Sequence, residues 1–312
     1  MNFYFAPMEG LTGYIYRNAH HAFFPGINKY FSPFIAANQR ESFRSRELKD
    51  ILPENNLGII LIPQLLTNNA NDFICASKRI QSLGYNEINL NLGCPSKTVV
   101  SKHKGAGFLS DKENLDAFFD EIFSNSSTEI SVKTRIGMDH PEEFYELISI
   151  FNKYPLKELI IHPRTQKDYY QNKPNLGIFK DALALSKNSV CYNGDIFTVK
   201  DYMEFSASFP EVKTLMLGRG LITDPGLVED ILHNTKLEKN KLRSFHDKIC
   251  EDYQKTLSGD CNVLFKMKEL WSYMITIFSD NSKYAKRIKK SQKLYEYNEA
   301  VANLFQEQDI LQ

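Results

Sequence analysis

Residues 87–96 read EINLNLGCPS, an isoleucine- and leucine-rich run that ends in a Gly-Cys-Pro turn. Similar runs recur along the chain, with GIILIP at 58–63, ELIIHP at 158–163 and TLMLG at 214–218. A strand that is covered on both faces reads as a nearly continuous apolar run, whereas a strand with one solvated face alternates. These runs therefore predict strands of a parallel sheet with helices on both sides.

Eight runs of this kind alternate with helix-sized segments. They lie at 3–6, 29–34, 58–64, 87–92, 130–134, 158–162, 190–193 and 214–217. The segments 69–83, 111–123, 142–154 and 198–209 are amphipathic and long enough for about three helical turns. Eight such units predict an α/β protein with a TIM (β/α)8 barrel, whose last helix ends near His233.

The rest of the chain has a different pattern. Residues 253–278 and 286–305 carry helical periodicity without β-branched runs, which predicts a helical appendage. Residues 236–241 are rich in charge, as is typical of a linker. We therefore predict a catalytic barrel at 1–235 and a small C-terminal helical domain at 242–312.

The composition is that of a globular protein with a large core. Of 312 residues, 42% are hydrophobic, and Lys+Arg and Asp+Glu both total 38, which excludes a disordered chain and a polycation. The five cysteines are scattered and never spaced as CxxC, which argues against disulfides and a zinc site. The N-terminus lacks the pattern of a signal peptide, and no stretch approaches about 18 apolar residues. We expect a cytoplasmic protein that does not span a membrane, and we infer no obligate protein partner.

In a TIM barrel the active site lies at the C-terminal ends of the strands, so the residues that end or follow each run are candidates for chemistry. They would bring a thiol, a lysine, a histidine and two Gly-rich turns to one end of the barrel. The candidates are Pro7, Met8, Gln64, Asn91, Cys94, Lys133, Arg135, His162, Asn193, Gly194, Asp195, Gly218 and Arg219.

Two glycine turns follow the last two predicted strands, NGD at 193–195 and GRG at 218–220. Barrels of this architecture often bind phosphate there, because glycine lets backbone N–H groups approach the anion. Either turn alone is an ordinary turn in most sequences. Together, at consecutive strand ends, they predict a phosphate-bearing cofactor.

Lys133 lies in the apolar-flanked run ISVKTRIG at 130–137. A lysine in the barrel interior is costly unless an anionic or electron-rich group, such as the edge of a flavin ring, meets it. The alternatives are a lysine that points outward and a Schiff-base lysine. His162 has the alternative of a satisfied core histidine, and Gln64 that of a cap at its strand end.

Cys94 lies in a turn at the end of a buried strand, which would place its thiol at the barrel mouth. A thiol with an unperturbed pKa near 8.5 is mostly protonated at neutral pH, so it is a candidate general acid. The alternative is an inert buried cysteine.

Seven motifs carry a resemblance to a known family. They are APMEG at 6–10, NLGCPSKTV at 91–99, GAG at 105–107, VKTRIG at 132–137, HPRTQ at 162–166, NGD at 193–195 and LGRG at 217–220. With these motifs in this order, the sequence resembles the tRNA-dihydrouridine synthases, flavin enzymes that reduce a uridine base in tRNA. The resemblance covers about residues 3–226, and a helical region of about the expected size follows.

The resemblance implies FMN as the bound cofactor of the barrel and NADPH as the reductant. It implies that FMN is held by Pro7, Met8, Gln64, Lys133, His162, Asn193, Gly194, Asp195, Gly218 and Arg219. The flipped uracil would be surrounded by Asn91, Lys133, Arg135 and His162. Hydride would pass from the flavin to C6 of uracil, and Cys94 would give the proton to C5.

A basic segment is the predicted grip on tRNA. Residues 283–293, KYAKRIKKSQK, hold six Lys or Arg and no acid, and we expect Lys286, Arg287, Lys289 and Lys290 to contact phosphates. Lys97, in the loop after Cys94, would add charge beside the site, and Gly105 and Gly107 would act as hinges of that loop. The alternative is a solvated helix face.

The sequence departs from the family at three places. It begins directly at the first strand, where many relatives carry a short β-hairpin, Pro163 stands where glycine is common, and the pair at 175–176 is Asn-Leu rather than Asp-Trp. None of these removes a catalytic group. Two other functions stay open, an FMN barrel that acts on a small pyrimidine and an RNA-binding protein that has lost catalysis, and the basic segment and Cys94 argue against them respectively.

Overall fold

Ten strand segments form the sheet in the computed structural model of this protein, which describes residues 1–39 and 43–311. They are β1 (Asn2–Phe5), β2 (Lys29–Phe31), β3 (Ile35–Ala36), β4 (Leu61–Ile62), β5 (Gln64–Leu66), β6 (Glu87–Leu92), β7 (Glu129–Arg135), β8 (Leu159–His162), β9 (Val190–Tyr192) and β10 (Thr214–Leu217). They pair in parallel in the order β3-β5-β6-β7-β8-β9-β10-β1-β2-β4.

The sheet is closed into a barrel, and two of its strands are each split into two short segments. β2 and β3 follow each other in one stretch, and β4 and β5 are separated only by Pro63, which has no N–H to give to a ladder. β2 pairs with β4 while β3 pairs with β5, so the two ends of the order meet. Counting each interrupted strand once leaves eight parallel strands, which confirms the predicted TIM barrel.

The predicted strands at 87–92 and 214–217 are reproduced as β6 and β10. The prediction for 58–64 is wrong at both ends, because the ladder begins at Leu61 and continues to Leu66. Gly58 has a φ of +80°, and Leu57 and Ile60 are exposed. Apolar residues that precede β4 therefore belong to a surface loop, which hydrophobicity alone does not reveal.

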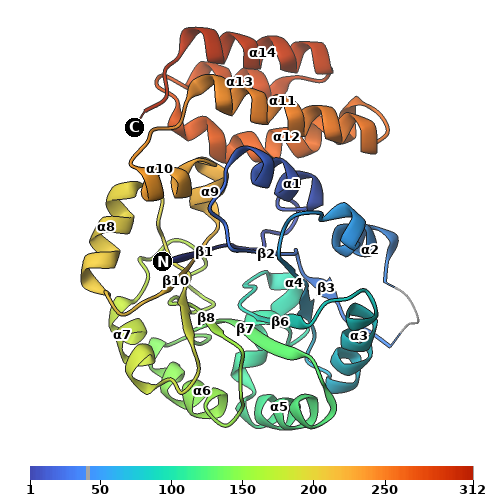
Figure 1. The fold of residues 1–312 in the computed structure, drawn as a ribbon, viewed down its shortest axis with the longest axis vertical. Helices are drawn as coiled ribbons and strands as arrows, with labels where there is room; N and C mark the ends of the chain where they lie inside the picture. The colour runs from blue at the N-terminus through green and yellow to red at the C-terminus, as the bar shows by residue number, and fades with distance from the viewer. Residues whose placement is uncertain (40–42, 312) are drawn as a thin grey trace. The chain divides into compact units, whose positions relative to one another are not determined.

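Helices lie outside the strands (Figure 1). Those that follow β3 to β8 are α2 (Ser45–Ile51), α3 (Ala70–Ser82), α4 (Lys97–Val100), α5 (Lys112–Asn125), α6 (Phe144–Phe151) and α7 (Leu176–Leu185). α3 shows how the sequence specifies them: the Asn69 side chain accepts from the Asp72 N–H at 2.9 Å, and Phe73, Ala76 and Ile80 form its buried stripe.

The chain forms two compact units, which do not divide at the predicted linker. The first holds residues 1–7, 28–195 and 206–217, and therefore all ten strand segments. The second holds residues 8–27, 196–205 and 218–312. Its helices are α1 (Tyr14–Phe23), α9 (Arg219–Thr223), α10 (Leu227–His233), α11 (Lys239–Thr256), α12 (Asp260–Met274), α13 (Ser282–Lys290) and α14 (Leu294–Glu307), and α8 (Val199–Ser208) lies in both units. The functional boundaries at 235 and 242 stay a prediction.

Within the second unit the helical prediction is right in kind and wrong in detail. α10 ends at His233 as predicted, but the stretch 253–278 is broken at Gly259, which has a φ of +78°. The predicted linker is also wrong from residue 239 on, because α11 begins there and Lys241 pairs with Glu229 at 2.5 Å. No helix of the described residues is long and apolar enough to cross a membrane.

The interior of the barrel is polar on one side and apolar on the other. A buried cluster of Tyr4, Ala6, Phe31, Ile62, Ile160, Cys191 and Met216 comes from β1 and its end, β2, β4, β8, β9 and β10. On β5, β6 and β7 the buried side chains include Gln64, Asn89 and Ser131 instead. The polar side is where the sequence places its candidate residues.

Candidate active site

A hydrogen-bonded chain of side chains crosses β5, β6 and β7. Gln64 Nε2 donates to Asn89 Oδ1 at 2.7 Å, and Asn89 Nδ2 donates to Ser131 Oγ at 3.0 Å. Asn91 Nδ2 donates to Gln64 Oε1 at 2.7 Å. Gln64 is fully buried and both ends of its amide bond within this network, and its assignment to FMN stays a prediction.

This network of side-chain hydrogen bonds ends on the turn that carries Cys94. Asn91 Oδ1 accepts from the N–H groups of Gly93 at 3.1 Å and Cys94 at 2.9 Å. Asn91 therefore fixes the backbone after β6 and leaves the half-buried Cys94 at the end of the strand. The amide oxygen of Asn91 thus holds the turn and its nitrogen holds Gln64, and the predicted contact of Asn91 with uracil stays a prediction.

The loop after Cys94 packs closely on the same turn. Ala106 N–H donates to the Cys94 carbonyl at 3.1 Å, and a Cβ on Gly105 would lie 2.9 Å from that oxygen. A Cβ on Gly107 would lie 2.8 Å from the carbonyl oxygen of Val100. The structure thus gives both glycines a packing reason, and their hinge role stays a prediction.

Arg135 ties this turn to the loop after β8. Its Nε donates to the Gly93 carbonyl at 3.0 Å, and its two terminal nitrogens donate to the carbonyls of Thr165 at 2.7 Å and Tyr169 at 2.8 Å. Gln166 Nε2 adds a bond to the Pro95 carbonyl at 3.1 Å. Arg135 is almost fully buried and its guanidinium holds two loops together, and its predicted contact with the substrate stays a prediction.

Lys133 is the cation of this region that lacks a partner. Lys133 lies opposite Asn91 in the register of the β6–β7 ladder. Its Nζ makes no hydrogen bond or ion pair with the described residues. Burial is the main reason that the pKa of Lys133 falls to about 8, and the nearby Arg135 lowers it further. An anionic or electron-rich ligand is what this amine lacks.

His162 at the end of β8 is bound by Arg164. Arg164 NH1 lies 3.0 Å from His162 Nε2 and 2.9 Å from Asp195 Oδ1, and its NH2 pairs with Asp195 Oδ2. A guanidinium only donates, so Nε2 of His162 accepts and the ring is neutral with its proton on Nδ1. Asp195, predicted to hold FMN, neutralises Arg164.

The turn after β9 is also held within the first unit. Asn193 Nδ2 donates to the Met216 carbonyl at 2.7 Å and ties β9 to β10. A Cβ on Gly194 would lie 2.0 Å from the Tyr192 hydroxyl, so this position requires glycine for packing whether or not phosphate binds. Pro7, half-buried, follows the end of β1.

Three predicted FMN ligands belong to the second unit. The Met8 N–H donates to Thr12 Oγ1 at 2.8 Å, Gly218 precedes α9, and the Arg219 guanidinium lies over the Phe197 ring at 5.3 Å from its centroid. Their assignment to FMN stays a prediction.

The basic residues divide into exposed and paired ones. Lys286, Lys289 and Lys290 are exposed on α13, whereas Tyr284 and Ile288 form its buried face. Arg287 donates to Glu299 at 2.9 Å, which weakens it as a phosphate ligand. Lys97 is exposed at the start of α4, in the first unit.

Sequence reasoning missed three residues that shape the site, Asn89, Ser131 and Gln166, and placed a fourth, Arg164, at a strand end without a role. Asn89 and Ser131 were counted only as strand residues, although their i+2 spacing from Asn91 and Lys133 places them on the same face of each strand. Arg164 and Gln166 lie in the HPRTQ motif, but their partners come from distant loops. Within the described residues, no group of three or more His, Cys, Asp or Glu could hold a metal ion.

Comparison with solved structures supports the fold. Morphinone reductase superposes with a TM-score of 0.52 at 11% identity, over 78% of this chain and 88% of that one. A structure of morphinone reductase in complex with tetrahydroNAD gives a TM-score of 0.51 at 12% identity, over 76% and 88%. At this identity the likeness concerns the barrel alone.

Comparison of sequences is more specific. The chain is 27% identical over 263 residues to a probable tRNA-dihydrouridine synthase of Rickettsia bellii, over 81% of this chain and 78% of the relative. It is 28% identical over 240 residues to a tRNA-dihydrouridine(16) synthase of Aquipseudomonas alcaligenes, over 72% and 73%. The model of the family described as dihydrouridine synthase (Dus) matches residues 4–312. This match spans the barrel and the helical region alike, and the chain therefore belongs to the dihydrouridine synthase family.

Proposed function

We propose that this protein reduces a uridine of tRNA to 5,6-dihydrouridine, with FMN as its cofactor and NADPH as the reductant. The observation that carries the proposal is the support of Cys94, whose backbone is held by Asn91 and Arg135 at a strand end beside an unpaired lysine. Family membership and the relatives named tRNA-dihydrouridine synthases point to the same reaction.

The residues of the first unit fit FMN. Lys133 offers an amine with three N–H donors and no hydrogen-bond partner among the described residues, which suits the electron-rich edge of a flavin. Pro7, Gln64, His162 and the turn at 193–195 would add further contacts from the first unit, and Met8, Gly218 and Arg219 would add those of the second unit. When bound, FMN would supply hydride to C6 of uracil, which amino-acid side chains cannot do.

Cys94 would supply the proton that C5 needs. Reduction of the C5=C6 bond leaves negative charge at C5 and the C4 carbonyl oxygen, and a thiol held at the strand end is a proton donor for C5. Lys133, protonated at neutral pH with a pKa of about 8, would stabilise charge in the same region. The hydrogen bonds of Asn91 and Arg135 to the backbone would keep the thiol in place and so lower the entropy cost of proton transfer.

A base inside a folded tRNA must leave its stack to reach such a site. The exposed lysines of α13, Lys286, Lys289 and Lys290, would bind phosphates of the tRNA. Lys97 would do so near Cys94.

The test is the reaction of the reduced protein with tRNA in a stopped-flow instrument. We expect Cys94→Ala to keep FMN and to oxidise NADPH normally, and to slow reoxidation of the flavin by tRNA by about 10²- to 10⁴-fold. Cys75→Ala, at an exposed cysteine of α3, is the matched control and should react as the wild type does. A colourless protein that cannot be reconstituted with FMN would contradict the cofactor, and faster reduction of free uracil than of tRNA would contradict the substrate.

A further inference from the structure

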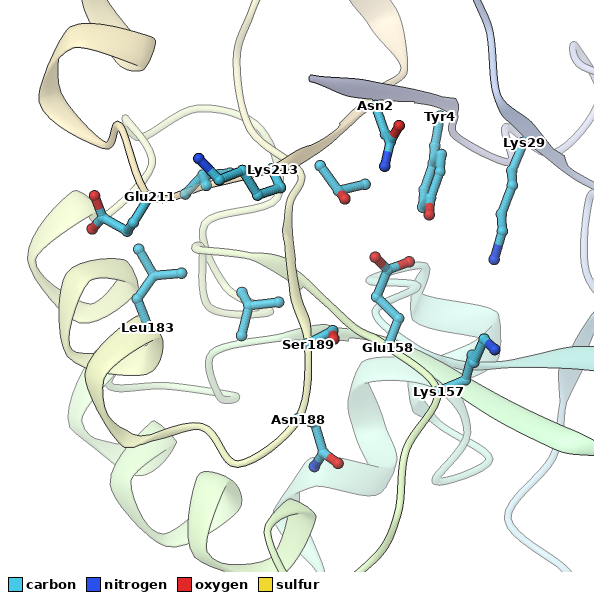
Figure 2. Close-up of a pocket in the computed structure, with 13 residues that line it drawn as sticks. Asn2, Tyr4, Lys29, Lys157, Glu158, Leu183, Asn188, Ser189, Glu211 and Lys213 are labelled. Atoms are coloured by element: carbon cyan, nitrogen blue, oxygen red, sulfur yellow. The ribbon is translucent and has the colours of Figure 1, made fainter.

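A pocket of about 570 Å³ opens at the N-terminal ends of the barrel strands, the end opposite Cys94. It is lined by the starts of β1, β2, β9 and β10 and by the residues before β8, all in the first unit. Sites for small molecules have volumes of roughly 300 to 1,000 Å³. Figure 2 shows the side chains that surround it.

The pocket is separate from the site around Cys94. The middle of the barrel is filled by the buried cluster that includes Phe31, Ile160 and Met216. Close-packed apolar side chains leave no path for a ligand along the barrel axis. A molecule in this pocket would therefore not be the flavin or the base of the proposed reaction.

Two buried carboxyl groups lie at this end of the barrel. Glu158 is 6% exposed and lines the pocket, and Glu87 is 8% exposed. Figure 2 shows the Glu158 carboxyl pointing toward the Tyr4 hydroxyl and the Asn2 amide. Tyr4 donates a hydrogen bond to Glu158, and Lys29 donates to Glu87 Oε2 at 2.6 Å. Glu158 Oε2 and Glu87 Oε1 have no hydrogen-bond partner in the part of the chain that the structure describes.

Of the two buried carboxyl groups, Glu87 has an ion pair and Glu158 has none among the described residues. Lys29 is the cation that pairs with Glu87, and Lys157 pairs instead with Glu129 at 2.7 Å. Glu158 has no ion pair within hydrogen-bonding distance among the described residues, and burial raises its pKa to about 7. An unpaired carboxylate and two unsatisfied oxygens are costly in a protein interior.

We propose that this pocket binds a small organic molecule with a single ammonium or guanidinium head group, which donates to the carboxyl group of Glu158 in the pocket wall. Such a head group brings a positive charge and N–H donors to a carboxyl group that has no ion pair among the described residues. A metal ion fits less well, because no group of three or more ligating side chains exists among the described residues.

Three probes of the same shape and different charge test the proposal on the full-length protein. They are n-butylammonium, n-butanol and n-butyrate, titrated into ¹⁵N-labelled protein while amide shifts are followed. We expect saturable shifts with n-butylammonium near Glu158, Val190 and Thr214, and none with the other two. Tighter binding of n-butyrate, or no saturable shift with n-butylammonium, would overturn the proposal.

Two variants locate the head group. Glu158→Gln keeps the shape of the side chain and removes its charge, and should weaken n-butylammonium by about 10- to 100-fold. Glu211→Gln, at an exposed carboxylate that also lines the pocket, is the matched control and should bind as the wild type does. Equal binding by the wild type and Glu158→Gln would refute the role of Glu158.

A pH series on the wild type serves if Glu158→Gln does not fold. An alkylammonium stays protonated between pH 6 and 8, whereas Glu158 gains a proton as the pH falls through about 7. Affinity for n-butylammonium should therefore fall by up to about tenfold from pH 8 to pH 6. The other groups that face Glu158 are Tyr4, Lys29, Glu87, Lys157 and Cys191, of which Tyr4 and Cys191 have raised pKa values and keep their protons in this range. An affinity that rises as the pH falls would contradict the proposal.

Discussion

Replacing Asn91 by alanine should loosen the turn that carries Cys94 and destabilise the barrel at the same time. The substitution removes the donor to Gln64 Oε1, a fully buried atom, and the acceptor for the N–H groups of Gly93 and Cys94. An unsatisfied buried oxygen costs about 1–3 kcal/mol, and each lost backbone bond contributes about 0.5–1.5 kcal/mol. The free energy of unfolding should therefore fall by about 2–6 kcal/mol.

Asn91→Asp separates the two parts of this effect. An aspartate still accepts from the turn, but it cannot donate to Gln64, so the turn should survive while the strand-side bond is lost. Urea unfolding measures the stability, and the rate at which tRNA reoxidises the reduced flavin measures the placement of Cys94. We expect about 10²-fold slower reoxidation for Asn91→Ala and a smaller loss for Asn91→Asp. Asn125→Ala, at an exposed residue that bonds only the Glu121 carbonyl, is the control. A loss below about 1 kcal/mol for Asn91→Ala, with a wild-type rate, would refute the argument.

Three further predictions concern other parts of the molecule. Replacing Lys286, Lys289 and Lys290 together by alanine should weaken tRNA binding and lower its salt slope by about 0.9 per lost contact, as measured by titration at several salt concentrations; an unaltered slope would remove α13 from the interface. The unfolded chain holds the proton of Lys133 between pH 8 and about 10.5, where the folded protein has released it, so the free energy of unfolding in urea should rise with pH over this window in the wild type and not in Lys133→Met. Tyr297→Phe leaves Trp271 Nε1 and His246 Nε2 without their partner and should cost about 2–4 kcal/mol by denaturant unfolding, whereas Tyr295→Phe, at an exposed ring, should cost almost nothing.

The barrel was predictable because its strands are specified locally. The run at 87–92 is isoleucine- and leucine-rich, lies between a turn and a Gly-Cys-Pro motif, and becomes β6 without change. The error at 58–64 has a local cause as well, because Gly58 and Pro63 interrupt an apolar run that extends into a loop. The break at Gly259 in the helical region was missed because periodicity continues on both sides of it.

The roles of side chains in the site were less predictable, because they depend on which backbone groups the loops bring to them. The sequence indicates that Arg135 lies at the end of β7, but not that carbonyls of the loop after β8 occupy its guanidinium. Gly194 shows the same limit. The NGD turn predicted a glycine for the approach of phosphate, and the structure shows that the Tyr192 hydroxyl would already exclude a side chain there.

The arrangement around Cys94 explains why polar residues are placed inside a barrel at a cost in stability. Asn91, Arg135 and Gln166 come from β6, β7 and the loop after β8, and each spends its donors or acceptors on the backbone of the turn at 93–95. Such bonds must be satisfied together or they destabilise the core, and so they define one position for the turn. The amine of Lys133, on β7, makes no hydrogen bond with the described residues. The groups whose bonds are spent on the backbone therefore build the site around the Cys94 thiol and the Lys133 amine.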